Sequence, residues 1–272
     1  MQKYYLSTDK LDILFEEMID CANFAKQIQK KIIREYKKDG SVLTKADIEI
    51  SNRIINKINI LFKDCNVVSE ETITPFNTSA PYTFVLDPID GTDVYSQGLP
   101  SFAIALGILD NNRKPVGAMI IAPRFGIAQE ELQIRLDPDK DLLIDNEIFS
   151  YKKEYKEISQ LAISSKLQKS LAFSKYSGKV RTFGSSILHI LSPVIFSNID
   201  GCINQRAFAW DMVASHAVLE KLNLKLLYSD KTPLIYDDNL LVERKVCKDI
   251  IYCGSEKCIN KMIQTLPQIT TD

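Results

Sequence analysis

The sequence predicts an α/β fold in which helices and strands are interspersed along the chain. Two observations lead to this prediction. Over residues 11–33 and again from residue 45 to residue 61, apolar side chains recur every three to four positions, which is the period of amphipathic helices. Short apolar runs of strand length, bounded by turn residues, then alternate with further helical stretches. Such a mixture favours an α/β or α+β class over an all-helical or all-strand protein.

The N-terminal part of the chain contains two predicted helices. Residues 11–33 have the helical spacing of apolar side chains, and Ser7 or Thr8 is available to cap this helix. A second helix is predicted to begin after Thr44 and to run to residue 61. Asp47 stands three positions after Thr44, which resembles a capping box with aspartate in place of glutamate.

Strands are predicted from there to the middle of the chain, at residues 67–69, 82–86, 102–109 and 116–122. The last two are expected to pair through a turn at residues 110–112. Residues 129–157 are charged and have no clear period, so this stretch is the expected boundary between two halves, residues 1–150 and 151–272.

The second half repeats the mixture of elements. Strands are expected at residues 161–164, 179–183 and 202–203, and helices at residues 186–196 and from Trp210 to residue 222. The two histidines, His189 and His216, fall in apolar helical stretches and are predicted to be packed in the interior. Neither histidine is therefore expected to act as a catalytic nucleophile.

Composition narrows the range of functions. A formal net charge of −1 gives no general attraction for a nucleic acid polymer or an anionic membrane. Residues 1–10 lack the pattern of a signal peptide, and no apolar run approaches the roughly 20 residues that span a bilayer. The six cysteines include no C-x-x-C pair, so reduced thiols are expected. These observations predict a soluble, cytoplasmic protein.

The residues that indicate chemistry are acidic and stand at the ends of predicted elements. Asp87 and Asp90 follow a strand, Pro88 keeps the chain extended there, and Gly91 permits a tight turn. Two carboxylates in such a turn can converge on a hard cation such as Mg²⁺, Mn²⁺ or Ca²⁺. Alternatively, the two aspartates cap backbone N–H groups and face solvent.

Further acidic residues have simple alternative interpretations when each is taken alone. Glu70 and Glu71 could be a solvated edge, Asp211 the N-cap of a helix, and Asp47 a surface charge. Their occurrence together, in one order along the chain, favours a shared metal site.

That order resembles the inositol monophosphatase family of lithium-sensitive, metal-dependent phosphomonoesterases, whose relatives include fructose-1,6-bisphosphatases and 3′(2′),5′-bisphosphate nucleotidases. The resemblance is carried by five segments: residues 42–47 (VLTKAD), 69–71 (SEE), 87–92 (DPIDGT), 184–186 (GSS) and 210–214 (WDMVA). It implies a layered α/β/α/β/α sugar-phosphatase fold with the active site between two halves. It also implies Mg²⁺-dependent hydrolysis of a small phosphomonoester by metal-activated water.

The resemblance assigns roles to particular residues. Two or three Mg²⁺ ions, with Mn²⁺ as an alternative, would be held by Glu70, Asp87, the carbonyl of Ile89, Asp90 and Asp211. Asp47 and Thr92 would orient and deprotonate the attacking water. The substrate would contact Gly91, Thr92, Asp93, Gly184, Ser185 and Asn204. Family members are commonly dimers, so a homodimer is also among the expectations.

The resemblance leaves the substrate open. Inositol monophosphate or a related sugar phosphate is the leading choice. However, Asn204 stands where inositol monophosphatases usually have glutamate, and an amide accepts hydrogen bonds less strongly than a carboxylate. A 3′(2′),5′-bisphosphate nucleotidase is the alternative within the same chemistry. A protein that binds a phosphorylated ligand without turnover is the alternative of another class.

Overall fold

The computed structural model describes residues 6–38, 40–153 and 157–269. Residues 1–5, which begin the segment without a signal-peptide pattern, lie outside the described part. Residues 154–156 of the predicted boundary lie outside it as well. Within that part, no helix combines the length and the apolar composition needed to cross a bilayer. All six cysteines lie in the described part and are free thiols, as the sequence predicts.

A seven-stranded sheet forms the first half of the molecule, with the strands side by side in chain order. Its strands are β3 (Asn66–Ser69), β4 (Tyr82–Asp90), β5 (Ala103–Asp110), β6 (Pro115–Ala122), β7 (Leu132–Leu136), β8 (Leu143–Ile144) and β9 (Glu147–Ile148). Neighbours pair antiparallel except β3 and β4, which are parallel. Parallel strands end at the same edge of a sheet, so the residues that follow β3 lie beside the end of β4.

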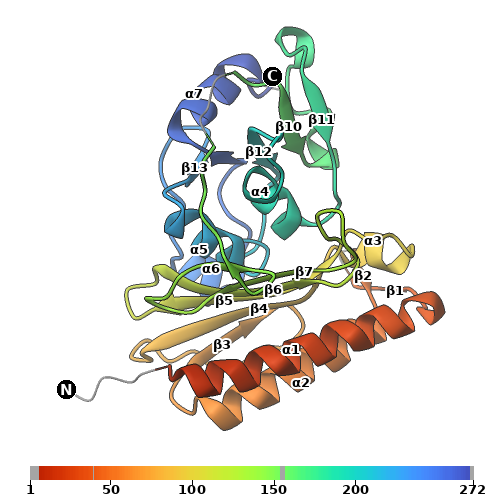
Figure 1. Ribbon diagram of the computed structural model, residues 1–272, viewed down its shortest axis with the longest axis vertical. Coiled ribbons are helices and arrows are strands. Elements are labelled where there is room, and N and C mark those ends of the chain that lie inside the picture. The colour runs from red at the N-terminus through yellow and green to blue at the C-terminus, as the bar shows by residue number, and fades with distance from the viewer. Residues whose placement is uncertain (1–5, 39, 154–156, 270–272) are drawn as a thin grey trace.

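Two long helices, α1 (Thr8–Ile28) and α2 (Lys45–Leu61), cover one face of this sheet (Figure 1). The one-sided spacing of their apolar residues produces this packing, because a helix with a single apolar face gains most by burying that face on a sheet. A short 3-10 turn (Gln29–Lys31) and the hairpin of β1 (Glu35–Tyr36) and β2 (Val42–Leu43) connect the two helices. The capping box predicted at the start of α2 is present.

The opposite face is covered by α4 (Ser186–Ile195) and α5 (Val213–Lys221), which separate it from a second sheet (Figure 1). The approach of α5 is close, since a Cβ on Gly107 of β5 would lie 2.4 Å from Val213 Cγ1. The second sheet has the strand order β11-β10-β12-β14-β13. These strands are β10 (Gln160–Ile163), β11 (Lys179–Arg181), β12 (Gly201–Asn204), β13 (Lys225–Tyr228) and β14 (Ile251–Gly254).

The remaining helix of that half, α7 (Glu256–Thr265), packs on the outer face of the second sheet. The layers are therefore helix, sheet, helix, sheet, helix, which confirms the predicted α/β/α/β/α arrangement. Short elements complete the chain: α3 (Thr92–Ser96), α6 (Asp238–Leu241) and the 3-10 turns Ser165–Leu167 and Phe173–Lys175.

Several sequence-based boundaries need correction. Helix α1 ends at Ile28 rather than at residue 33, and Ser7 occupies its N-cap position without a side-chain hydrogen bond. Strand β4 continues through Asp90. Asp87 and Asp90 therefore lie within this strand and not in a turn after it. Strands β7, β8 and β9 occupy much of the charged stretch at residues 129–157 and extend the first sheet to Ile148.

The division into residues 1–150 and 151–272 stays a prediction. Strands β3–β9 precede residue 150 and β10–β14 follow it. However, one continuous core joins the two sheets through α4 and α5, and it includes Val85 and Ala118 from the first half and Leu226 from the second. The two halves thus share their interior.

Candidate metal-dependent active site

A bulge near the end of β4 brings Asp87 and Asp90 to the same side. In a regular strand, residues three apart point to opposite faces. Here Asp87 pairs with Ala105 and Asp90 pairs with Ala103, so β4 has one residue more than β5 over this stretch. That extra residue restores a common direction. The two carboxylates converge as the sequence predicts, although a bulge rather than a turn achieves it.

The third carboxylate of the cluster, that of Asp211, comes from the other half, just before α5. Each of Asp87, Asp90 and Asp211 offers one carboxylate oxygen such that the three atoms lie within 4.8 Å of one another. Asp211 is not the N-cap of α5, because Met212 occupies that position; instead its Oδ2 accepts a hydrogen bond from the Phe208 amide at 2.7 Å. The cluster therefore spans the boundary between the first sheet and α5.

Burial and mutual repulsion dominate the electrostatics of this cluster. Both effects raise the pKa of Asp87 and of Asp211 well above the usual range of a carboxyl group. Asp87 Oδ1 is buried and has no hydrogen-bond partner among the described residues. Buried carboxylates that repel one another suit a divalent cation with a preference for hard oxygen ligands. The residues present thus fit a Mg²⁺ or Mn²⁺ site.

Asp90 also holds the N-terminus of α4 through hydrogen bonds. Its carboxylate accepts hydrogen bonds from the amides of Ser186 (3.0 Å) and Ile187 (2.7 Å) and from the hydroxyl of Ser185. These donors lie at the N-terminus of α4, where amide groups have no partner within the helix. Burial raises the pKa of Asp90 to about 6, and these hydrogen bonds act in the opposite direction. Asp90 therefore fixes α4 against the end of β4.

Glu70 lies beside this cluster because β3 pairs parallel with β4 and ends at Ser69, which stands opposite Leu86. Its amide donates to the carbonyl of Leu86 at 3.2 Å, directly before Asp87. Its carboxylate is 2.7 Å from Lys37 Nζ, and Glu71 is 2.6 Å from the same ammonium group. The interpretation of this pair as a solvated edge is therefore wrong. Burial raises the pKa of Glu70 to about 7, and the nearby Lys37 opposes that shift.

Asp47 and Thr92 form a hydrogen-bonded pair at the edge of the carboxylate cluster. Asp47 is fully buried, so its interpretation as a surface charge is wrong. Its Oδ2 accepts from the Thr44 amide (2.8 Å) and hydroxyl (2.6 Å), while Oδ1 lies 3.1 Å from the Thr92 hydroxyl. That hydroxyl is also 2.9 Å from the carbonyl of Ile89. Burial raises the pKa of Asp47 to about 6, and the hydrogen bonds from Thr44 and Thr92 lower it.

Gly91 provides the sharp change of direction between β4 and α3. It occupies the N-cap of α3 with a φ of 88°, a left-handed conformation that a glycine adopts without strain. A side chain there would also meet the carbonyl oxygens of Ser101 and Gly184 at 3.3 Å. The amides at this turn thus lie at the start of a helix, next to the carboxylates.

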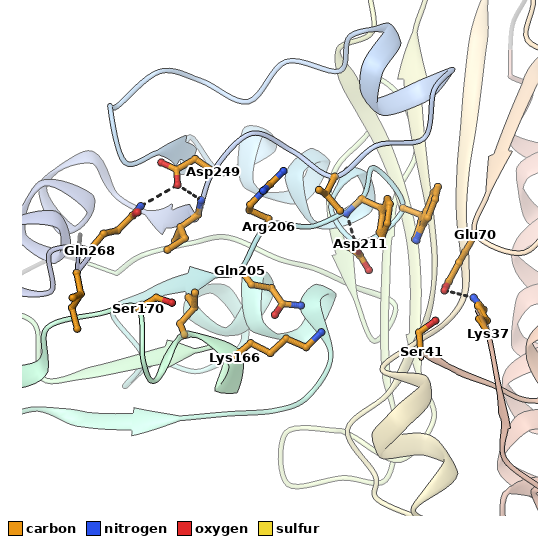
Figure 2. Close-up of a pocket in the computed structure, with 16 residues that line it drawn as sticks. Lys37, Ser41, Glu70, Lys166, Ser170, Gln205, Arg206, Asp211, Asp249 and Gln268 are labelled. Carbon is orange, nitrogen blue, oxygen red and sulfur yellow. Dashed lines mark hydrogen bonds and ion pairs between the residues drawn. The ribbon is translucent and has the colours of Figure 1, made fainter. Parts of the chain in front are cut away.

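Two adjoining cavities lie next to the site, and the larger of them reaches two of its carboxylates. The larger, about 810 Å³, is lined by Glu70 and Asp211 (Figure 2). The smaller, about 480 Å³, is lined by four of the predicted substrate residues, namely Gly91, Asp93, Gly184 and Asn204. Lys166 and Gln205 line both. Ser185 lines neither, because its hydroxyl is directed to Asp90.

Asn204 is an unusual residue in the smaller cavity. Its side chain is buried, and neither Oδ1 nor Nδ2 has a hydrogen-bond partner among the described residues. Buried polar atoms are nearly always paired, since an unpaired group loses its hydration without compensation. This amide is therefore available to a polar group that enters the cavity.

Several site residues could not be identified from the sequence. Lys37, Lys166 and Arg206 line the larger cavity, but no spacing or motif distinguishes them from surface cations. Arg244 donates to the carbonyl of Glu70 at 2.8 Å, and its guanidinium group lies 4.9 Å from the centre of the Trp210 ring. Arg244 thus connects the segment after β3 to the segment that carries Asp211.

The raised pKa values lead to a prediction about stability in the absence of divalent metal. Carboxyl groups whose folded-state pKa is about 6 to 7 bind protons more tightly in the folded than in the unfolded protein. Their contribution to stability is complete below pH ~4 and is lost as the pH rises through about 6 to 7. We therefore expect Mg²⁺ to raise the melting temperature by at least ~5 °C more at pH 8 than at pH 5.

Differential scanning fluorimetry with and without chelator, at both pH values, measures this difference. Comparing the two metal states at each pH removes the contribution of groups that do not interact with the metal. A Mg²⁺ effect that is equal at both pH values, or larger at pH 5, would contradict the assignment of the cluster.

Comparison with known proteins agrees with this geometry. A sequence profile of the inositol monophosphatase family matches residues 13–260. The chain is 33% identical over 119 residues to a fructose-1,6-bisphosphatase/inositol-1-monophosphatase of Methanocaldococcus jannaschii, covering 40% of this chain and 43% of that protein. It is 31% identical over 98 residues to the 3′(2′),5′-bisphosphate nucleotidase CysQ of Haemophilus influenzae, covering 35% and 36%.

The matched region spans less than half the length of the first curated relatives. Structural similarity extends further. A solved structure of staphylococcal inositol monophosphatase-1 superposes with a TM-score of 0.78 over 96% of each chain, at 17% identity. At that identity, the structural match establishes the fold.

Proposed function

The chain belongs to the inositol monophosphatase family, and from this we propose that it hydrolyses a small phosphomonoester with the help of Mg²⁺. The observation that carries the proposal is the carboxylate cluster. Asp87, Asp90 and Asp211 bring three oxygens within 4.8 Å of one another, and Asp211 lines the larger cavity. A cluster of this kind is repulsive by itself and becomes favourable when it holds cations.

We assign the metal ligands as the family resemblance implies. Glu70, Asp87 and the carbonyl of Ile89 would hold one Mg²⁺ ion, and Asp87, Asp90 and Asp211 a second; Mn²⁺ could replace either. Glu70 would have to leave its ion pair with Lys37 to do so. Bound divalent ions supply positive charge that offsets the negative phosphate and favours ionisation of the attacking water.

Asp47 and Thr92 would accept and transfer the proton of that water. The Thr92 hydroxyl donates its hydrogen to Asp47 Oδ1, so the lone pairs of Thr92 Oγ1 remain available to accept a hydrogen bond. A water molecule can then donate to Oγ1. As the water oxygen bonds to phosphorus, Thr92 passes its own proton to Asp47 and takes up the proton of the water. The phosphorus–oxygen bond to the alcohol part of the substrate breaks in the same step, and the departing alcohol oxygen takes a proton from solvent. The pKa of Asp47, about 6, suits a group that accepts a proton near neutral pH.

The phosphate itself would lie at the start of α3. The amides of Gly91 and Thr92 stand at this turn, and N–H groups at a helix start attract phosphate oxygens. Asp93, Gly184 and Asn204 line the adjoining cavity and would contact the alcohol part of the substrate. We propose Ser185 as an indirect contributor, acting through its hydrogen bond to Asp90.

The leading substrate class is inositol monophosphate or a related sugar phosphate. The unpaired amide of Asn204 supports it, because an amide both donates to and accepts from hydroxyl groups. A 3′(2′),5′-bisphosphate nucleotidase is the second candidate, supported by two of the cations that line the larger cavity, Lys166 and Arg206. A non-catalytic binding protein is less favoured, since a binder has no need of the Asp47–Thr92 pair.

Two broader proposals accompany the activity. Free thiols at all six cysteines support a reducing compartment such as the cytoplasm. A homodimer is proposed from the family alone, and an ultracentrifugation measurement would test it.

Release of inorganic phosphate by the purified protein tests the function. Inositol 1-phosphate, fructose 1,6-bisphosphate and 3′-phosphoadenosine 5′-phosphate would each be incubated with Mg²⁺ or with chelator. We expect release that depends on Mg²⁺ from at least one of them. No release from any, in a folded sample that binds Mg²⁺, would favour the non-catalytic alternative.

A further inference from the structure

We infer that Arg244 is a positioning residue of the metal site, whose guanidinium group holds the segment that carries Glu70 against the segment that carries Asp211. This inference rests on the proposed function and adds a residue to the proposed site. Arg244 would contact neither a metal ion nor the substrate. Its role would be to hold two carboxylates from distant parts of the chain at the spacing that lets both bind metal.

Glu70 and Asp211 reach the metal site from segments that are far apart in the chain. Glu70 follows β3 of the first sheet, and Asp211 stands just before α5. Figure 2 shows both side chains at one cavity, on separate segments. In the proposed site each completes the ligands of one metal ion, and Asp87 is shared. Because metal–ligand distances are short and fixed, the relative position of the two segments decides whether both sets of ligands can form.

Arg244 lies between α6 and β14 and binds the segment that follows β3. Its two terminal nitrogens each donate to a backbone carbonyl, Nη2 to Glu70 at 2.8 Å and Nη1 to Thr72 at 3.1 Å. A guanidinium group directs its N–H groups in fixed directions within one plane, so two bonds to one segment set both its position and its orientation. Both acceptors are main-chain oxygens. Arg244 therefore holds Glu70 without using the carboxylate that a metal ion would need.

The same guanidinium group is also in contact with the segment that carries Asp211. It lies 4.9 Å from the centre of the Trp210 ring, directly before Asp211. Trp210 is buried and stacks on Phe208 with ring centroids 4.7 Å apart. The Phe208 amide in turn donates to Asp211 Oδ2 at 2.7 Å. Since closely packed rings have little freedom to shift, the position of Arg244 is coupled to that of the Asp211 carboxylate.

A second cation near Glu70, that of Lys37, has a different relation to the metal site. Its ammonium group is 2.7 Å from the Glu70 carboxylate and occupies an oxygen that a metal ion would use. Burial lowers the pKa of Arg244, and the nearby charges of Glu70 and Glu71 oppose that shift, so the charge of Arg244 also reaches this position. As charges alone, both cations repel a metal ion, and removing either would strengthen metal binding. A positioning role predicts the opposite result for Arg244.

Isothermal titration calorimetry with Mn²⁺, in the absence of substrate, tests this sign. We expect Arg244→Lys to lower the Mn²⁺ affinity by about 10- to 100-fold although it keeps the charge, because lysine does not reproduce the two fixed donors or the planar stacking. Arg244→Met should lower the affinity as well. Lys37→Met should instead raise it, since it frees the Glu70 carboxylate. If Arg244→Met also raised the affinity, Arg244 would act only through its charge and the inference would be overturned.

Arg113, in the turn between β5 and β6, provides the matched control. Its φ of 61° is left-handed, like the φ of 55° at Arg244, and its guanidinium group lies 5.7 Å from the centre of the Phe76 ring. It also joins two distant segments, since Nη1 donates to the carbonyl of Tyr236 at 3.4 Å and Nη2 pairs with Asp238. These partners are not predicted metal ligands. Arg113→Lys should therefore leave the Mn²⁺ affinity nearly unchanged, and a loss equal to that of Arg244→Lys would contradict the inference.

Melting temperatures measured with chelator present separate positioning from general stability. Arg244→Lys and Arg113→Lys each weaken contacts between distant segments, so each should lower the melting temperature by about 2–4 °C. A loss of Mn²⁺ affinity confined to Arg244→Lys is then not a result of destabilisation.

A double-mutant cycle tests the connection through Trp210. Trp210→Leu should lower the Mn²⁺ affinity of the wild type but have a much smaller effect when Arg244→Lys is already present, because the two residues act through one contact. Fully additive losses in the double variant would contradict the coupling of Arg244 to Asp211.

Metal binding also separates this inference from the proposed function, because the calorimetry needs no substrate. If the wild type binds Mn²⁺ with this dependence on Arg244 but hydrolyses none of the three phosphate esters, the inference stands and the activity does not. If it hydrolyses one of them while Arg244→Lys binds Mn²⁺ as tightly as the wild type, the activity stands and the inference does not.

Discussion

Asp87→Asn is expected to lower kcat by at least about 10³-fold with saturating Mg²⁺, because the substitution removes a charged ligand shared by the proposed metal ions. The side chain keeps its size. Asp87 Oδ1 has no hydrogen-bond partner among the described residues, so little structure depends on its charge. Steady-state phosphate release, measured on whichever substrate the wild type hydrolyses, gives the result.

The same variant should be more stable than the wild type when metal is absent. Asp87 is buried beside Glu70, Asp90 and Asp211, and these neighbours raise its pKa further above the range that burial produces. Neutralising it relieves that repulsion, so we expect a higher melting temperature in chelator together with a smaller increase on adding Mg²⁺.

Asp64→Asn provides the control, since Asp64 is an exposed aspartate at the other end of β3. It should leave both activity and the Mg²⁺ response unchanged. If Asp87→Asn retained more than about a tenth of the wild-type kcat, the assignment of Asp87 as a metal ligand would be wrong.

Asp90→Asn is a less informative change, although Asp90 belongs to the same cluster. Its two oxygens accept from the amides of Ser186 and Ile187 and from the Ser185 hydroxyl. An asparagine has one acceptor oxygen, so its NH₂ group would face one of these donors. Loss of activity in this variant would therefore combine a metal effect with a weaker attachment of α4.

Asp47→Asn is expected to lower kcat by about 10²- to 10⁴-fold while leaving Mg²⁺ binding nearly intact. The amide oxygen can still accept from Thr44 and keep the capping box. The NH₂ group would then face Thr92 Oγ1 as a donor, where the carboxylate was an acceptor. Thr92 could no longer pass the proton of the attacking water to residue 47.

Thr92 supplies the matched comparison. Thr92→Ser keeps the hydroxyl and should retain most of the activity, whereas Thr92→Val keeps the shape and should lose about as much as Asp47→Asn. The Mg²⁺-induced increase in melting temperature should be similar in all three variants. If Asp47→Asn also abolished that increase, Asp47 would act in metal binding rather than in proton transfer.

Much of the fold follows from local sequence patterns. The apolar spacing of α1 and α2 predicts both helices, and the Thr44–Asp47 capping box is located correctly. Strands β3 to β6 have clear apolar runs and lie within a few residues of their predicted positions. Strands β7 to β9 were not predicted, because two of them have only two residues and they lie in a charged stretch where tertiary pairing determines structure.

The acidic residues of the site are identifiable from the sequence, but their contacts are not. Asp87 and Asp90 converge because β4 has a bulge in its pairing with β5, a strand that comes later in the chain. The pairing of Lys37 with Glu70 joins residues 33 positions apart, and Arg244 reaches the Glu70 carbonyl across 174 positions. Such contacts depend on how the layers pack, which no local pattern encodes.

A crystal structure with Mn²⁺ bound tests the central claim most directly, because manganese is located by its anomalous scattering. We expect anomalous peaks contacted by the carboxylates of Asp87, Asp90 and Asp211, with Glu70 turned from Lys37 toward the metal. Manganese that binds only elsewhere in the protein would contradict the account. So would the absence of manganese from this site, with the Lys37–Glu70 ion pair intact, at a concentration that supports full activity.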